Sequence, residues 1–217
     1  MLEVRGSNPF GSTLVFMTSI AVLDYGLGNL RSVFRGLTAA GATPVLTADP
    51  EVIAAADGIL LPGVGAFAEG MEMLAPLVPL IKEQAEEKPL MGICLGMQML
   101  LEESEEHGIH EGLSFIPGRI RMFAKAERFK VPQMGWNSIS PQQNHPLFEG
   151  IEDGTYVYFV HSYYADTTPE ATIAKTEYGI SYASAVASGN VMGTQFHPEK
   201  SGDAGIRILG NFVSLCD

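Results

Sequence analysis

The chain is poor in cysteine, tryptophan and positive charge. Its 217 residues include two cysteines, one tryptophan and 13 lysines or arginines, against 25 aspartates or glutamates, which gives a formal net charge of −12. Such a balance argues against a nucleic-acid partner, because phosphate backbones require a basic face. No uninterrupted apolar run reaches the roughly 20 residues of a membrane-spanning helix, so no membrane association is expected. Scarce cysteine fits a reducing compartment, and we expect a cytoplasmic protein.

The order of apolar runs and breaks predicts an α/β protein. A hydrophobic fraction of 46% supplies a sizeable core, and one domain is the default for this length. Strand-like and helix-like segments alternate over the first half, which implies βαβ units around a parallel sheet. A strand-rich meander over residues 113–194 extends the sheet, and a last helix runs from residue 201 or 202 to 215. The expected strands of the first half are residues 20–24, 43–47, 58–61 and 89–93. The expected helices are residues 29–40, 68–87 and 95 to about 103. The second of these helices is expected to break near Pro76 and Pro79.

Residues 1–16 differ in character from the rest of the chain. They are polar and rich in turn-forming residues, with no apolar stretch long enough for a signal peptide. We expect a disordered leader there and a single domain over residues 17–217, since no internal repeat, low-complexity tract or linker divides the remainder.

Cys94 lies between an apolar, strand-like run and a helix-forming run, in the sequence Gly-Ile-Cys-Leu-Gly. A thiol on a sharp strand-to-helix turn lies over the helix N-terminus, whose partial positive charge favours the thiolate. The flanking glycines allow a turn too tight for side chains at those positions. The pattern is typical of a nucleophile elbow with sulfur in place of a serine oxygen. From this segment alone, a buried core cysteine is an equal alternative.

A nucleophilic cysteine needs a base, and His197 is the candidate. It lies at the end of a strand-like run, in the sequence Gln-Phe-His-Pro-Glu. Glu199, two residues later, can hold one ring nitrogen and leave the other facing the sulfur. Pro198 between them stiffens the pair. Together with the cysteine elbow, this arrangement favours catalysis over a structural histidine.

A glycine-punctuated loop, Pro-Gly-Val-Gly at residues 62–65, follows a further strand-like run. Acyl transfer develops an oxyanion, which a pair of preorganised backbone N–H groups stabilises. The amide of Leu95, just after the nucleophile, is one natural donor, and Gly63 or Val64 is a candidate for the other. Without the elbow, an ordinary strand-to-helix turn would be the preferred interpretation of this loop.

These three segments, in this order, resemble the class I (triad) glutamine amidotransferases. Asp-Tyr-Gly-Leu-Gly-Asn at residues 24–29 and Met-Gly-Trp-Asn at residues 134–137 make the resemblance closest to one branch, the glutaminase subunits of imidazole glycerol phosphate synthases. The resemblance runs from about residue 17 to the C-terminus. It implies a flavodoxin-like α/β fold, with a mixed, mostly parallel central sheet, helices on both faces and a nucleophile elbow.

The resemblance also implies a reaction. Cys94 would attack the side-chain amide of L-glutamine to give a glutamyl thioester and ammonia, with His197 as base and then acid and Glu199 holding it. Water would release glutamate. The ammonia would pass to a separate cyclase subunit, in a heterodimer, for the synthesis of imidazole glycerol phosphate and aminoimidazole carboxamide ribotide in histidine biosynthesis. Members of this branch are nearly silent as glutaminases without that partner, and a Gly-Val-Gly loop able to flip a peptide suits such control.

Further roles are carried over from the resemblance. The residues expected to bind the substrate glutamine are Gln98, Ser162 and Tyr163. The residues expected at the partner interface, or to act as gates, are Asn29, Gln133, Trp136 and Lys200. Gln133 departs from the family, which commonly carries histidine there; glutamine keeps a hydrogen-bonding side chain but cannot become a cation near neutral pH.

Two further motifs have simpler interpretations. Residues 26–31 follow a strand and open a helix, but Arg31 replaces the third glycine of a dinucleotide-binding fingerprint. The stretch of glutamates and histidines over residues 102–111 is interpreted as the solvated end of the elbow helix rather than a metal site. No metal and no other cofactor is expected.

Two other functions remain open. One is a glutaminase subunit of a different ammonia-channelling synthase, against which the Met-Gly-Trp-Asn segment argues. The other is a catalytically idle regulatory module on the same fold, but an idle site has no physical need for Cys94, His197 and Glu199 together. A cysteine peptidase of this fold is less favoured, because glutaminase-type sequence surrounds the elbow.

Overall fold

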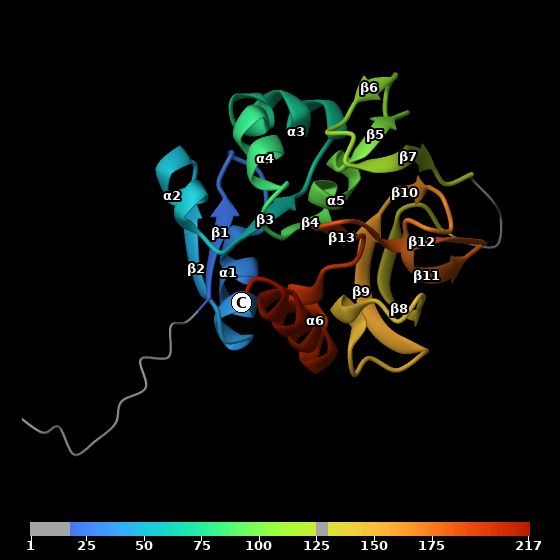
Figure 1. Ribbon diagram of the computed structural model, residues 1–217. Coiled ribbons are helices and arrows are strands. Elements are labelled where there is room, and N and C mark those ends of the chain that lie inside the picture. Colours follow the sequence, from blue (N-terminus) through green and yellow to red (C-terminus); the bar gives the residue numbers. More distant parts are fainter. Residues whose placement is uncertain (1–17, 125–129) are drawn as a thin grey trace, which may run out of the picture.

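The computed structural model describes residues 18–124 and 130–217 (Figure 1). Its sheet starts with parallel strands in the order β2-β1-β3-β4-β13, as the alternating pattern predicts. These strands are β1 (Ser19–Leu23), β2 (Thr43–Thr47), β3 (Gly58–Gly63), β4 (Leu90–Cys94) and β13 (Val191–Thr194). The leader expected over residues 1–16 lies outside the described residues.

The second half of the chain extends this sheet in a mostly antiparallel manner, which confirms the predicted meander. From β13 the order continues through β12, β10, β7, β5 and β6, while β11 joins β12 to the hairpin of β8 and β9. These strands are β5 (Leu101–Ser104), β6 (His110–Glu111), β7 (Ile116–Met122), β8 (Gln133–Pro141), β9 (Thr155–His161), β10 (Tyr163–Asp166), β11 (Thr172–Tyr178) and β12 (Ile180–Ser188).

Helices cover both faces of the sheet (Figure 1). Alternate residues of β1 enter opposite cores: Val22 joins Leu37 of α1 and Phe212 of α6, whereas Leu23 joins Phe67 of α3. The helices are α1 (Leu30–Ala39), α2 (Pro50–Ala55), α3 (Phe67–Leu74), α4 (Val78–Gln84), α5 (Leu95–Met99) and α6 (Gly202–Leu215), with short 3-10 turns η1 (Ala75–Leu77), η2 (Pro146–Phe148) and η3 (Pro198–Lys200). The mixed sheet, whose central strands β2-β1-β3-β4-β13 are parallel and which has helices on both faces, is therefore confirmed.

Local signals account for several boundaries. α1 ends at Ala39, and Gly41 just beyond its C-cap has φ 94°. The Ala42 N–H bonds back to the Leu37 carbonyl, as in a Schellman motif. The break predicted near the two prolines separates α3 from α4. α2 was not predicted, although Asp49 caps it through the Glu51 N–H and a proline follows at its first position.

The helix after Cys94 is shorter than the sequence predicts. α5 ends at Met99 and is followed by strand β5, where a helix to about residue 103 is expected. The Ile116 N–H bonds to the Leu100 carbonyl, and the Leu113 N–H bonds to the Met99 carbonyl. These long-range bonds satisfy carbonyls at the helix end and direct the chain into the sheet, so tertiary pairing overrides the local helical tendency.

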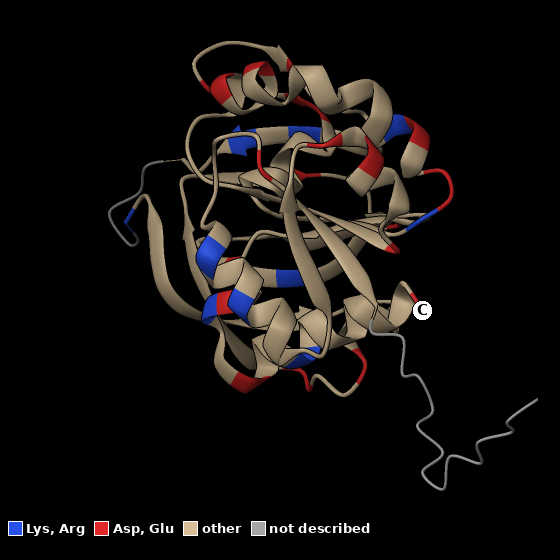
Figure 2. Ribbon diagram, turned by 90° about the vertical axis from the view of Figure 1, so that its left-hand side faces the viewer, with Lys and Arg blue, Asp and Glu red and all other residues tan. Residues whose placement is uncertain are grey.

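Charge is distributed without a continuous basic band on the face that Figure 2 presents: Asp and Glu lie on helices and loops above and below the sheet, and Lys and Arg occupy several separate places. None of the helices in the described part of the chain has the length and apolar character needed to cross a bilayer.

The tight approach of α5 to the sheet yields a test by substitution. A Cβ on Gly96 would overlap the carbonyl oxygen of Leu61, so Gly96→Ala is expected to lower the free energy of unfolding by about 1–3 kcal/mol. Gly210→Ala in α6 is the control, because its nearest neighbour would be the Ala40 carbonyl oxygen at 3.9 Å. Denaturant unfolding compares the two variants, and equal midpoints would contradict the close approach.

Candidate active site

Cys94 lies at the junction of β4 and α5 in a positive-φ conformation, with φ 56° and ψ −110°. This conformation is unusual for a residue with a side chain and is typical of strained functional turns. The flanking glycines provide space: a Cβ on Gly92 would lie 2.6 Å from the Gly96 backbone, and one on Gly96 would strike Leu61. The structure therefore has the geometry of the predicted elbow, with the thiol 8% exposed at its tip.

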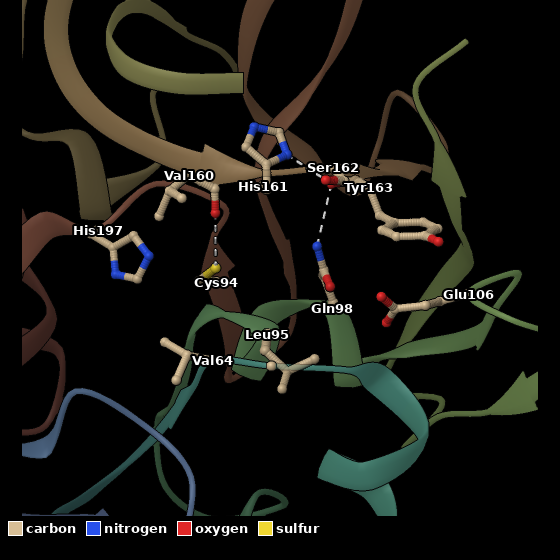
Figure 3. A pocket seen from close by; sticks show the side chains of 11 residues that line it. Val64, Cys94, Leu95, Gln98, Glu106, Val160, His161, Ser162, Tyr163 and His197 are labelled. Atoms are coloured by element: carbon tan, nitrogen blue, oxygen red, sulfur yellow. Dashed lines mark hydrogen bonds between the residues drawn. The ribbon is translucent and has the colours of Figure 1, made fainter. Parts of the chain in front are cut away.

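His197 and Glu199 form a buried pair between β13 and α6. His197 Nδ1 lies 2.8 Å from Glu199 Oε1, and the two side chains are 2% and 1% exposed. The imidazole lies beside Cys94 (Figure 3). Burial lowers the pKa of His197, but the adjacent Cys94 and the hydrogen-bonded carboxylate of Glu199 outweigh it and raise that pKa to about 9. The ring thus favours the imidazolium form next to the sulfur.

Backbone contacts fix the position of His197. Its N–H donates to the Tyr158 carbonyl on β9 at 2.9 Å. The Ser201 hydroxyl donates to the His197 carbonyl at 2.6 Å and accepts from the Tyr158 N–H at 3.0 Å. The histidine is therefore tied to the β8–β9 hairpin as well as to its own turn.

A cavity of about 380 Å³ opens over these side chains (Figure 3). It brings together Cys94, His197 and all three residues expected to bind glutamine; Val64 and Leu95 of the expected oxyanion hole also line it. The third, Gly63, pairs with Cys94 across β3 and β4. The full lining comprises Val64, Gly65, Cys94, Leu95, Gln98, Glu106, Val160, His161, Ser162, Tyr163 and His197.

Gln98 is held in place by two acceptors. Its Nε2 donates to the Tyr163 carbonyl at 3.3 Å and to Gln195 Oε1 at 3.0 Å. Gln195 in turn directs its Nε2 towards the Cys94 sulfur at 3.8 Å. No role was predicted for Gln195, although it opens the Gln-Phe-His-Pro-Glu segment.

Glu106 contradicts the interpretation of residues 102–111 as a solvated helix end. This residue follows strand β5, lines the cavity, and accepts the Phe67 N–H at the start of α3 at 2.6 Å. Burial and the charge of Glu106 both raise the pKa of the nearby Tyr163 hydroxyl. The missing signal is tertiary, since Glu106 follows a strand, β5, and not a helix. In residues 18–124 and 130–217, no group of three or more His, Cys, Asp or Glu is placed to hold a metal ion.

Tyr25 supports the loop opposite Cys94. Its hydroxyl donates to the Pro62 carbonyl at 2.7 Å, and a Cβ on Gly63 would lie 2.8 Å from that hydroxyl. Burial, and then the nearby charge of Cys94, raise the pKa of Tyr25, so its phenol stays protonated as a donor. The sequence pointed to this residue only as part of the Asp-Tyr-Gly segment.

The four residues expected at a partner interface do not share one environment. Trp136 is 55% exposed and packs edge-on against Tyr158, with ring centroids 6.2 Å apart. Lys200 lies over the same Tyr158 ring at 5.8 Å. Asn29 lies at the start of α1 without a side-chain capping bond. Gln133 is only 2% exposed, so its side chain is not placed for direct contact with a partner.

The chain is similar to known proteins over nearly its whole length. The family described as glutamine amidotransferase class-I matches residues 21–215. The imidazole glycerol phosphate synthase subunit HisH of Methanosarcina mazei is 59% identical over 203 residues, covering 92% of this chain and 100% of that relative. The subunit of the same name from Bacillus cereus is 49% identical over 201 residues, covering 91% of this chain and 95% of the relative.

Solved structures show a similar fold. A glutamine amidotransferase has a TM-score of 0.70 at 18% identity, covering 91% of this chain and 98% of the other. The structure of PurLQS from Thermotoga maritima has a TM-score of 0.68 at 20% identity, with coverage of 91% and 98%. At such low identity, these two structures bear on the fold alone.

The His197–Glu199 pair leads to a titration test. NMR should give a pKa of about 9 for the His197 imidazole, so the ring keeps its proton at neutral pH and loses it as the pH rises through that value. Glu199→Gln removes one charge and should lower this pKa by about one unit or more. His161, whose pKa burial lowers to about 4, is an internal control that stays neutral. A wild-type His197 that titrates near the ordinary 6.5 would contradict the description.

Proposed function

The chain belongs to the class I glutamine amidotransferases, and we propose that it is the glutaminase subunit of an imidazole glycerol phosphate synthase, acting in histidine biosynthesis. The observation that carries this proposal is the meeting of Cys94 and His197 at one cavity, with Glu199 holding the far side of the imidazole, in a chain 59% identical to a subunit of that name. A catalysis that depends on a free thiol also fits the reducing cytosol.

The cavity suits glutamine at both ends. Glu106 presents a carboxylate for the α-ammonium group, and Gln98, Ser162 and Tyr163 surround the same end. The side-chain amide then points towards Cys94 at the other end of the cavity. Because Gln98 spends both N–H groups on protein acceptors, its side-chain oxygen is left to accept from the substrate.

The proposed reaction starts from a Cys94 thiolate beside the His197 imidazolium. The sulfur bonds to the amide carbon, and the carbonyl electron pair moves to oxygen, where backbone N–H groups stabilise it. As the C–N bond breaks, the imidazolium gives its proton to the leaving nitrogen and ammonia departs. His197 then removes a proton from water, the hydroxide attacks the thioester, and the sulfur leaves as thiolate with glutamate as product.

The oxyanion donors are assigned to Leu95 and to the loop that carries Gly63 and Val64. Leu95 opens α5, so its N–H adds to a helix N-terminus that favours negative charge. Gly65, with φ 114°, gives the loop a hinge that a residue with a side chain would strain. We propose that the partner controls a peptide flip in this loop, which turns a backbone N–H into the oxyanion hole.

The partner is proposed to be a cyclase subunit that receives the ammonia. The exposed face of β8 and β9 suits its docking: Met134, Trp136 and Tyr156 are 66%, 55% and 61% exposed on neighbouring strands. Lys200 adds a cation at the edge of this face over Tyr158. Since Tyr158 also holds the His197 backbone, a partner on this face would contact the support of the base directly.

Reconstitution tests the function. Mixed with a cyclase subunit and its ribonucleotide substrate, the protein should release glutamate, and neither protein alone should do so. Glutamate release that ignores both additions would contradict the proposal. Activation by a different synthase instead would identify the chain as the ammonia source of that enzyme.

Substitution tests the nucleophile in the same mixture. Cys94→Ala should abolish glutamine use while leaving synthesis from free ammonia intact, because only the thioester step needs the thiol. Cys216→Ala removes the other cysteine, at the C-terminal end of α6, and should leave both activities unchanged. Glutamine use that survives Cys94→Ala would exclude this residue as the nucleophile.

The docking face has its own test. Trp136→Ala should weaken binding of the cyclase subunit by about tenfold or more, as expected of a large exposed anchor. Ile109→Ala, at an equally exposed position between β5 and β6, should leave the affinity unchanged. Titration calorimetry or fluorescence anisotropy measures both variants, and equal affinities would argue against this face.

A further inference from the structure

A line of buried polar groups connects strand β8 to the wall of the cavity. The Gln133 amide lies 3.0 Å from the Tyr182 hydroxyl, which lies 3.2 Å from His161 Nε2. His161 Nδ1 lies 2.7 Å from the Tyr163 carbonyl oxygen. The three side chains are 2%, 3% and 6% exposed, so water does not replace these contacts. The proposed reaction assigns no role to them.

The direction of these hydrogen bonds follows from their chemistry. A carbonyl oxygen only accepts, so His161 Nδ1 must carry the hydrogen that it donates to Tyr163. Burial lowers the pKa of His161 to about 4, and the nearby charge of His197 acts in the same direction, so the ring is neutral and its Nε2 accepts. The Thr176 hydroxyl beside Tyr182 already donates to the Ser138 carbonyl at 3.0 Å, so it has no proton to give. The neutral Nε2 needs a donor, and the Tyr182 hydroxyl at 3.2 Å is in place to be that donor, so we assign its single proton to His161.

The Gln133 amide completes the sequence of donors. With its proton on His161, Tyr182 offers Gln133 only an acceptor, which requires an N–H from Gln133. The side-chain nitrogen of Gln133 is otherwise buried without a partner. Exchanging the amide oxygen and nitrogen, which have the same shape, places that N–H on the Tyr182 oxygen. A lone buried carbonyl oxygen is also less costly than an unpaired N–H group.

We propose that Gln133, Tyr182 and His161 form a one-way chain of hydrogen bonds ending on the Tyr163 carbonyl, and that Tyr182 and His161 are positioning residues for glutamine binding. The Tyr163 carbonyl has a second lone pair, and Gln98 uses it. Fixing that carbonyl fixes Gln98, whose oxygen faces the substrate. The kinetic half of this inference rests on the proposed glutaminase function.

The surroundings of His161 favour a single orientation of its ring. Phe123 and Phe159 lie against it, with ring centroids 5.3 and 5.6 Å away. In such a low-dielectric environment, hydrogen bonds are strong and a buried polar group without a partner costs free energy. Reversing the direction of the donors along these bonds is therefore unfavourable. His161 also follows Val160, whose carbonyl lies 3.9 Å from the Cys94 sulfur, so the same strand end serves both parts of the cavity.

The tautomer of His161 tests the chain directly. Nitrogen-15 NMR of histidine-labelled protein should show His161 with the hydrogen on Nδ1 and none on Nε2. In Tyr182→Phe the Nε2 resonance should move towards that of a nitrogen without a hydrogen bond. A hydrogen on Nε2 in the wild-type protein would overturn the one-way chain. This measurement needs no substrate, so its result is independent of the proposed function.

A pair of substitutions tests the positioning role in the cyclase complex. Asparagine places its amide nitrogen near the site of histidine Nδ1, whereas glutamine reaches the site of Nε2. His161→Asn should therefore keep the KM for glutamine within about threefold of wild type, and His161→Gln should raise it about tenfold, with kcat changed less than KM in both. The reverse order, or equal effects in variants of equal Tm, would overturn the role.

A matched tyrosine pair completes the experiment. Tyr182→Phe deletes only the hydroxyl and keeps the bond from His161 to the Tyr163 carbonyl, so it should raise the KM for glutamine about threefold, no more than His161→Asn. Tyr178→Phe deletes a hydroxyl that donates to the Lys130 carbonyl from a ring near the same Phe123, and should leave the KM unchanged. Equal kinetics of the two variants would overturn the role of Tyr182. If the wild-type protein showed no glutaminase activity in the complex, the proposed function would be contradicted. The tautomer of His161 would still show whether the one-way chain of hydrogen bonds exists.

Discussion

The close contact of α5 with the backbones of β3 and β4 is the constraint on which the site depends. Glycines at positions 92 and 96 permit it, because any side chain there would strike backbone atoms of the neighbouring segment. With α5 so close, the chain must turn sharply at Cys94, whose φ is positive. The thiol is thereby raised into the cavity, and the first N–H groups of the helix lie under it.

The other side chains around this thiol come from other helices, strands and turns. His197 and Glu199 come from the turn between β13 and α6, and their position depends on the β8–β9 hairpin through Tyr158. The opposite wall comes from β9 and β10, held by the buried polar groups around His161. The exposed face of the hairpin and the backbone of His197 therefore share one support, Tyr158, through which the proposed docking surface is directly connected to the proposed base.

Much of this was predictable from the sequence, because the signals are local. The parallel strands follow from apolar runs bounded by breaks, and β2 has the predicted bounds. The elbow at Cys94 is predictable from a strand-like run, a glycine-flanked turn and a helix-forming run. The His197–Glu199 pair is predictable from the two-residue spacing between them. The motif pattern alone does not identify the substrate of the thiol; glutamine is predicted from the family resemblance.

The misses share a tertiary cause. The elbow helix was predicted too long because the bonds that end it come from residues 113–116, far along the chain. That error hid Glu106, which belongs to the cavity only because β5 leads to it. Tyr25 and Gln195 lie within recognised segments, but their partners, a proline carbonyl and a cysteine sulfur, lie 37 and 101 residues away. Such pairings carry no local pattern.

The central claim is that the Cys94 sulfur forms a covalent bond to the substrate. Mass spectrometry of the complex, quenched with acid during turnover of glutamine, tests it most directly. The account predicts a glutamyl group on the peptide that contains Cys94, absent when hydroxylamine has cleaved the thioester. An unmodified Cys94 peptide under conditions of steady glutamate release, or a glutamyl group on another residue, would contradict it.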